Sequence, residues 1–134
     1  MSGVADAVQF LTLSEVLTIL RDQITRYGGE FGVRDLSLLS SAIAVPQAAF
    51  AGHALHDNLH AMAAAYAFHI CQNHPFVDGN KRVALATALV FLDINGVTIS
   101  DSDPTGRLYD MMMAVAQSRI GKSVIATLLH KLSV

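Results

Sequence analysis

Residues 74–82 carry the side chains of this chain best suited to chemistry on a phosphate group. They read His-Pro-Phe-Val-Asp-Gly-Asn-Lys-Arg, and a helical pattern of apolar residues follows. The first N–H groups of a helix have no partner inside the helix and lie at the positive end of its dipole. A helix that begins near Gly79 would therefore offer an anion site. Because glycine has no side chain, a bound group could approach the backbone closely there.

The other polar residues of this segment extend the hypothesis from binding to catalysis. Asn80, Lys81 and Arg82 add hydrogen-bond donors and two positive charges in the same turn. Asp78 stands just before the helix, where a carboxylate can cap the helix or hold Mg²⁺. His74 is the one side chain here that can accept a proton near neutral pH. This combination predicts phosphoryl or nucleotidyl transfer, in which positioning and charge stabilisation supply most of the catalysis.

Each residue also has an ordinary structural interpretation. Asp78 can be a plain helix cap, and His74 can be a loop histidine. Lys81 and Arg82 can form a solvated face, while Phe76 is expected to anchor the loop in the core. The occurrence of all these residues in one short segment favours the functional interpretation.

The elements that position this segment are predicted to be helices, because apolar residues recur with helical spacing almost throughout the chain. Thr12 and Glu15 have the spacing of a capping box for a first helix, which ends at Gly28. Asp35 can cap a short second helix. The remaining predicted helices are 55–73, 79–95, 105–118 and 122–132, with at most a short strand at 97–100. The fold class is therefore all-α, with two central helices joined by a turn at 74–78, where Pro75 cannot continue a helix.

Composition limits the class of protein. The chain has 134 residues, which we interpret as a single domain spanning 1–134. With 52% hydrophobic and 15% charged residues, the chain is not disordered. This composition has two explanations: a partner or a second copy of the chain covers some apolar surface, or the helical core is simply rich in alanine. Nine Lys and Arg and a net charge of −2 argue against direct DNA binding. A cytoplasmic protein with no membrane span is predicted for three reasons. Cys71 is the only cysteine and is expected to serve packing, the N-terminus lacks the basic region of a secretory signal, and the apolar run 83–92 is too short to cross a bilayer.

Segment 74–82 resembles the signature of the Fic/Doc family, HxFx(D/E)GN(G/K)R. Lys81 makes the segment similar to the death-on-curing (Doc) branch rather than to the AMP-transferring Fic branch. Residues 26–47 also resemble the N-terminal part of Doc-family chains, and the likeness covers most of 12–100. The resemblance implies a Fic/Doc-like helical bundle and a toxin of a type II toxin–antitoxin system. Such a toxin uses ATP and Mg²⁺ to phosphorylate a threonine of elongation factor Tu and so arrests translation.

The resemblance also implies a role for each motif residue. His74 would be the general base on the target hydroxyl, and Asp78 would be the Mg²⁺ ligand. The other implied site residues contact the nucleotide phosphates: Gly79, Asn80, Lys81 and Arg82. AMP-transferring enzymes have glycine in place of Lys81, which leaves room for the inner phosphates. The lysine fills that space and fits an inverted nucleotide that presents its γ-phosphate.

Three departures from the family pattern refine these expectations. Leu85 stands where many Fic enzymes carry a further arginine, which favours the Doc branch. Residues 48–58 are too few for an elaborate hairpin that docks a target. The family's inhibitory motif is absent, so we expect a separate antitoxin that binds as an amphipathic helix in an apolar groove. The methionines 111–113 would line this groove or, as the favoured alternative, fill the core.

Other functions stay open at this stage: AMP transfer, a catalytically silent module that binds the antitoxin, or an HD-type metal phosphohydrolase. The last possibility comes from His53, His56 and His60, whose spacing of three and four residues would put them on one face of a helix, with Asp57 beside them. Ordinary surface or hinge histidines are the favoured alternative. His69 is expected to be a hydrogen-bonded core residue rather than a ligand. A homo-oligomer is also possible.

Overall fold

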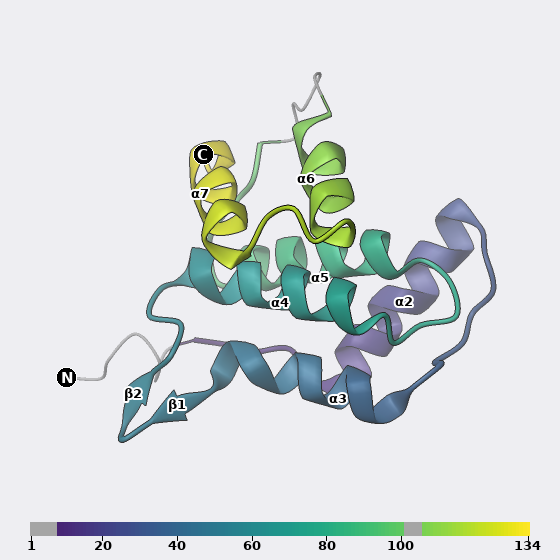
Figure 1. The fold of residues 1–134 in the computed structure, drawn as a ribbon, viewed down its shortest axis with the longest axis horizontal. Coiled ribbons are helices and arrows are strands. Elements are labelled where there is room, and N and C mark those ends of the chain that lie inside the picture. The colour runs from purple at the N-terminus through teal and green to yellow at the C-terminus, as the bar shows by residue number, and fades with distance from the viewer. Residues whose placement is uncertain (1–7, 101–105) are drawn as a thin grey trace.

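The computed structural model describes residues 8–100 and 106–134. Within these residues six α-helices account for most of the chain, so the predicted all-α fold class is confirmed (Figure 1). The helices are α2 Leu13–Tyr27, α3 Leu36–Ala44, α4 Leu59–Asn73, α5 Asn80–Ile94, α6 Arg107–Ala116 and α7 Lys122–Leu132. A 3-10 helix, η1 Val45–Gln47, and a hairpin of β1 Ala49–Phe50 and β2 His53–Ala54 connect α3 to α4.

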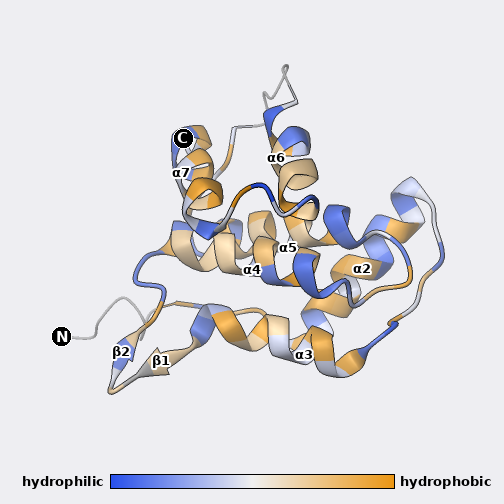
Figure 2. Ribbon diagram, viewed as in Figure 1, coloured by the Kyte–Doolittle hydropathy of each residue, from blue (hydrophilic) through white to orange (hydrophobic). Residues whose placement is uncertain are grey.

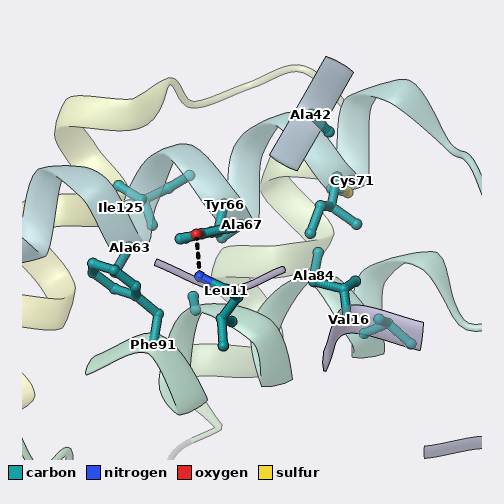
Figure 3. Packing of buried hydrophobic residues seen from close by; sticks show 14 of the residues in the cluster. Leu11, Val16, Ala42, Ala63, Tyr66, Ala67, Cys71, Ala84, Phe91 and Ile125 are labelled. Carbon is teal, nitrogen blue, oxygen red and sulfur yellow. Dashed lines mark hydrogen bonds between the residues drawn. The ribbon is translucent and has the colours of Figure 1, made fainter. Parts of the chain in front are cut away.

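Helix α4 is at the centre of the fold. It packs against α3, α5, α6 and α7, while α2 packs against α5. In Figure 1, α6 and α7 lie on one side of α4 and α3 lies on the other. Alanines let the central helices approach closely, because Ala63, Ala67 and Ala84 are fully buried among larger side chains (Figure 3). The two central helices that the sequence predicts are thus α4 and α5, and they hold the loop between them.

A buried tyrosine ties the N-terminal segment to this centre. The hydroxyl of Tyr66 on α4 accepts a hydrogen bond from the backbone N–H of Leu11 at 2.9 Å (Figure 3). Its ring lies 5.1 Å from that of Phe91 on α5. Burial raises the pKa of Tyr66 to about 12, so the hydroxyl keeps its proton. A single side chain therefore links the segment before α2 to both central helices.

The local signals for the first two helices are confirmed. Thr12 and Glu15 form both hydrogen bonds of the capping box at the start of α2. The helix ends at Gly28, whose φ of 89° is costly for any residue with a side chain. Asp35 caps α3 by accepting from the N–H of Leu38.

The predicted helix 55–73 begins four residues too early, because α4 starts at Leu59. The side chain of Asn58 accepts from the N–H of Ala61 at 2.8 Å and caps the helix there. The preceding residues form the hairpin, whose turn at Ala51 and Gly52 has φ angles of 52° and 81°. Such turns prefer Asn-Gly, so Ala-Gly gave only a weak sequence signal. The hairpin lies at the opposite end of α4 from the loop that joins α4 to α5 (Figure 1).

The C-terminal helices match their predicted places, although α6 is shorter at both ends. Thr105, the predicted first residue of α6, lies outside the described residues. Met111 and Met112 are buried in the core, which confirms the favoured interpretation for these two, whereas Met113 is only partly buried. In the expected short strand, Ile99 forms an isolated bridge with Ser133. Among the described helices, none has both the length and the hydrophobicity that a membrane span requires.

Candidate active site at the loop between α4 and α5

Residues 74–79 form a sharp loop between the two central helices. Helix α4 ends at Asn73, and its C-cap His74 adopts a left-handed conformation with φ 50° and ψ 53°. The N–H of His74 donates to the carbonyl of Ile70. Helix α5 begins at Asn80, with Gly79 as its N-cap at φ 81°. Both left-handed residues turn the chain abruptly, and the histidine does so at an energetic cost. The loop therefore presents the imidazole directly beside the N-terminus of α5.

Asn80 holds this loop in shape. Asn80 is buried, with only 6% of the residue exposed. The amide oxygen accepts from the N–H of Phe76 at 2.9 Å, and the amide nitrogen donates to the carbonyl of Phe76 at 3.0 Å. The same nitrogen lies 3.3 Å from Nδ1 and 3.4 Å from Nε2 of His74. Asn80 thus gives its side chain to the loop and the imidazole, and only its backbone N–H belongs to the open first turn of α5.

Phe76 anchors the loop as the sequence predicts. Its side chain is fully buried in the hydrophobic core. Its backbone also pairs with Val33 in an isolated bridge. The loop buries Pro75 and Phe76 and leaves Val77 and Asp78 exposed.

A second loop, between α2 and α3, is hydrogen-bonded to the first. The carboxylate of Asp78 accepts from the backbone N–H of Glu30 at 2.7 Å, and the N–H of Val77 donates to the carbonyl of Gly32 at 3.0 Å. A Cβ atom on Gly29 would lie only 3.2 Å from Cβ of Asp78, so the backbone approaches more closely than most side chains allow. The residues that the second loop contributes to this contact belong to 26–47, the second stretch of the family resemblance. Sequence reasoning missed the contact, although the glycines at 28, 29 and 32 were a signal for it.

The loop and the start of α5 border a cleft of about 980 Å³, a size typical of sites for small ligands. All the site residues predicted from the sequence line it: His74, Asp78, Gly79, Asn80, Lys81 and Arg82. The structure therefore brings the predicted set together in one place. Helices α5 and α6 contribute large apolar side chains to the lining: Leu85, Tyr109, Met112 and Met113. Figure 2 shows hydrophilic residues at the end of α4 and the start of α5, next to largely hydrophobic helix middles.

The two basic residues of the motif differ in their surroundings. Arg82 is partly buried, donates from Nη2 to the carbonyl of Gly28 at 2.9 Å, and lies 5.5 Å from the ring centre of Tyr27. Lys81 is exposed at the cleft. To contact a bound phosphate with this nitrogen, Arg82 would have to give up its hydrogen bond to Gly28, whereas the exposed Lys81 is the more readily available cation.

Asp78 fits the requirements of a Mg²⁺ ligand. It is exposed at the cleft beside the N-terminus of α5, and the hydrogen bond from Glu30 fixes its orientation through one oxygen. A carboxylate retains further lone pairs for a metal. Mg²⁺ is commonly held by one or two carboxylates together with substrate phosphates. The chemistry of the cleft thus suits a magnesium nucleotide.

Cys71 also borders the cleft but is not suited to act as a nucleophile. Its side chain is buried, and burial raises the pKa of the thiol, although the charge of Lys81 acts in the opposite direction. The thiol form therefore dominates near neutral pH, and the thiolate is the reactive species. This agrees with the packing role expected from the sequence.

The predicted face of metal-binding histidines does not exist. His53 lies on β2, His56 lies in the bend that follows, and only His60 belongs to α4. This alternative is wrong because it required one helix to include all three residues, whereas α4 begins at Leu59. Instead, Nζ of Lys122 lies 3.1 Å from Nε2 of His56 and 3.0 Å from Nε2 of His69. Within residues 8–100 and 106–134, no group of three His, Cys, Asp or Glu side chains could hold a metal ion.

The contact of Lys122 with two histidines predicts acid sensitivity. Burial, followed by the charges of Lys122 and His56, lowers the pKa of His69 to about 4. Burial and Lys122 also lower the pKa of His56, against an opposing effect of Asp57. In the unfolded chain both imidazoles titrate near their ordinary value of about 6.5. The unfolded state thus binds more protons in this range, so the stability contribution is complete above pH 6.5 and is lost as the pH falls toward 4.

We expect the free energy of unfolding to decrease between pH 6.5 and 4, and to decrease less in the His69→Gln variant. Glutamine can still accept a hydrogen bond from Lys122 but does not titrate. Urea titrations at several pH values measure this difference. His53→Gln is the matched control, because His53 is exposed on the hairpin. Equal pH dependence in wild type and His69→Gln would contradict the prediction.

Comparison with known proteins adds a second line of evidence. The model of the Fic/DOC family matches residues 10–92, which include the whole cleft motif. The chain is 44% identical over 90 residues to the protein named Toxin Doc of Mycolicibacterium smegmatis, covering 67% of this chain and 69% of that protein. It is 33% identical over 125 residues to Protein kinase doc of Escherichia phage P1, covering 93% of this chain and 96% of the phage protein. These matches extend well beyond the motif.

Proposed function

The chain belongs to the Fic/DOC family, and on that premise we propose that it is the toxin of a toxin–antitoxin pair. Its activity would be to transfer the γ-phosphate of ATP to a threonine hydroxyl of a translation factor such as elongation factor Tu. The relatives named as a toxin and as a protein kinase support this function. The single observation that carries it is the cleft in which His74, Asp78 and the N-terminus of α5 lie together. The whole chain would act as one domain in the cytoplasm.

The proposed reaction assigns distinct tasks to the residues that line the cleft. His74 accepts the proton of the attacking hydroxyl, whose oxygen forms a bond to the γ-phosphorus while the bond to the bridging oxygen breaks and ADP leaves. The open N–H groups in the first turn of α5 and the ammonium of Lys81 stabilise the charge on the phosphates. Asp78 would hold Mg²⁺, which neutralises phosphate charge when bound.

The exposed Lys81 is the residue that we expect to select phosphate transfer over AMP transfer. Replacing Lys81 by glycine removes a charge and opens space beside the start of α5. We expect the Lys81→Gly variant to transfer γ-phosphate more slowly and to gain some transfer of AMP. Parallel reactions with γ-labelled and α-labelled ATP measure both products. An unchanged ratio of the two labels would contradict the proposed nucleotide orientation.

Labelled ATP also tests the function itself. Purified chain is incubated with elongation factor Tu and ATP labelled at the γ- or the α-phosphate. Label from the γ-phosphate on the factor supports the proposed kinase, and label from the α-phosphate supports AMP transfer instead. If a parallel reaction in a cell extract puts γ-phosphate label on a different protein, the chain is still a kinase but its target is that protein. Absence of label on any protein would favour a silent module that only binds the antitoxin.

The antitoxin is the partner that this function requires. It would supply an amphipathic helix whose apolar face covers an apolar groove. Leu85 and Met113 in the cleft lining, with the exposed ring of Tyr109, are the side chains that would meet such a helix. The low share of charged residues, 15%, supports a surface that is covered in part. Co-purification of the chain with the product of a neighbouring gene tests this partner.

A further inference from the structure

The conformation of His74 raises the question of what holds it. A left-handed conformation is unfavourable for a residue other than glycine, so surrounding contacts must maintain it. The hydrogen bond from the N–H of His74 to Ile70 fixes only one side of the residue. The last carbonyls of α4 also need partners, because no further turn of the helix follows.

Arg34 supplies these partners. Its Nε donates to the carbonyl of His74 at 2.9 Å, and its Nη2 donates to the same oxygen at 2.6 Å. Nη2 also lies 3.3 Å from the carbonyl of Asn73. The positive guanidinium thus stands at the negative end of the α4 dipole, where a cation is favoured.

The backbone of Arg34 and Asp35 makes further hydrogen bonds to the loop. The N–H groups of Arg34 and Asp35 donate to the carbonyl of Pro75 at 2.7 Å and 3.1 Å. Three consecutive carbonyls, those of residues 73–75, therefore accept hydrogen bonds from this one segment. Among the residues that the structure describes, the lining of the cleft does not include Arg34. Arg34 therefore contacts the cleft only indirectly, through the backbone carbonyls of residues 73–75.

We infer that Arg34 is a positioning residue that sets the direction of the His74 imidazole by holding its carbonyl. The planar guanidinium has several donors in a fixed arrangement, whereas the ammonium of lysine is a single point with rotating donors. A lysine at this position would keep the positive charge at the end of α4, but it could not donate from two nitrogens to the carbonyl oxygen of His74 as Arg34 does. This role rests on the proposed function only where catalysis is measured, because the position of the imidazole can be observed directly.

The decisive measurement compares the Arg34→Gln and Arg34→Lys variants with wild type by NMR of the imidazole nitrogens. We expect the His74 signals to shift in both variants, while those of His69 and His130 stay in place. Arg26→Gln is the matched control, because Arg26 is an exposed arginine bonded to Asp22 at 2.8 Å, outside the loop. Unchanged His74 signals in both variants, as in the control, would overturn the inference. If Arg34→Gln does not fold, Arg34→Lys alone decides.

A kinetic measurement separates positioning from simple loss of folded protein. The number of ATP molecules bound per chain is determined first, and the rate of a single turnover is then measured at saturating ATP. We expect both variants to bind ATP stoichiometrically and to transfer phosphate about 10²-fold more slowly, the effect of a small misplacement of a reacting group. A wild-type rate in Arg34→Lys would overturn the inference. If the wild type itself transfers no label to any protein, the proposed function fails and the NMR comparison still decides the role of Arg34.

Discussion

Replacing His74 by alanine is expected to lower the rate of phosphate transfer about 10²–10⁴-fold, the usual effect of losing a positioned acid–base group. The imidazole lies at the cleft against the side chain of Asn80, and the base on the target hydroxyl is its proposed role. ATP binding should change little, because the phosphates meet the N-terminus of α5 rather than this ring. Single-turnover rates with γ-labelled ATP, together with ATP affinities, measure the two effects separately.

The left-handed backbone at residue 74 calls for a second variant. Alanine tolerates a positive φ less well than histidine or asparagine does, so a fall in rate could come from a changed loop. His74→Asn keeps a residue suited to this conformation but has no group that accepts a proton near neutral pH. Both variants should be equally slow. His53→Ala, an exposed histidine at the hairpin, is the control that should keep full activity. Wild-type activity in His74→Asn would exclude His74 as the base.

Replacing Asn80 by aspartate is the second change with a large expected effect. The substitution alters one atom but turns a donor that lies 3.0 Å from the carbonyl of Phe76 into an acceptor. The loss of this buried hydrogen bond should lower the free energy of unfolding by about 1–3 kcal/mol. The new negative charge also stands at the proposed phosphate site. We expect ATP affinity to fall about 10- to 100-fold, equivalent to about 1.4–2.8 kcal/mol.

The other end of α5 offers a matched control for this change. The side chain of Asn95 accepts from the N–H of Gln9 at 2.9 Å and donates to the carbonyls of Gln9 and Phe91 at 2.9 Å and 2.8 Å. Asn95→Asp therefore breaks the same kind of bond far along the helix from the cleft. Urea unfolding and calorimetric titration with ATP should show that both variants lose stability but only Asn80→Asp loses affinity. Equal ATP affinity in the two variants would contradict a phosphate site at the start of α5.

These contacts also explain why the motif spans nine residues. Only some of its members face the cleft as chemical groups, while Phe76 and the side chain of Asn80 fix the loop itself. The structure thus changes the expected contribution of Asn80, from a phosphate ligand by its side chain to a support for the loop and the imidazole. Mutations of supporting residues should therefore resemble mutations of the reacting ones.

Some features could be predicted because their causes are local. The capping box of α2, the Asp35 cap and the stop at Gly28 each depend on a few neighbouring residues, and the structure contains all of them. The start of α4 could not be placed in this way. The residues at 55–58 have a helical pattern, but the pairing of β1 with β2 precedes them and the cap at Asn58 starts α4 only at Leu59. The expected row of histidines failed for the same reason.

Local patterns were enough to predict the all-α class and the position of the motif between two helices, because periodicity, caps and a proline act over one or two turns. The way in which the loop is held depends on contacts that form only in the folded chain. The contacts of Glu30 with Asp78 and of Arg34 with His74 join residues about 40 or more positions apart, and no local pattern specifies them. Long-range packing likewise decided that Lys122 meets His56 and His69. Side chains far apart in the chain become neighbours only when the core closes, which is why the partners of the motif were invisible until the fold was known.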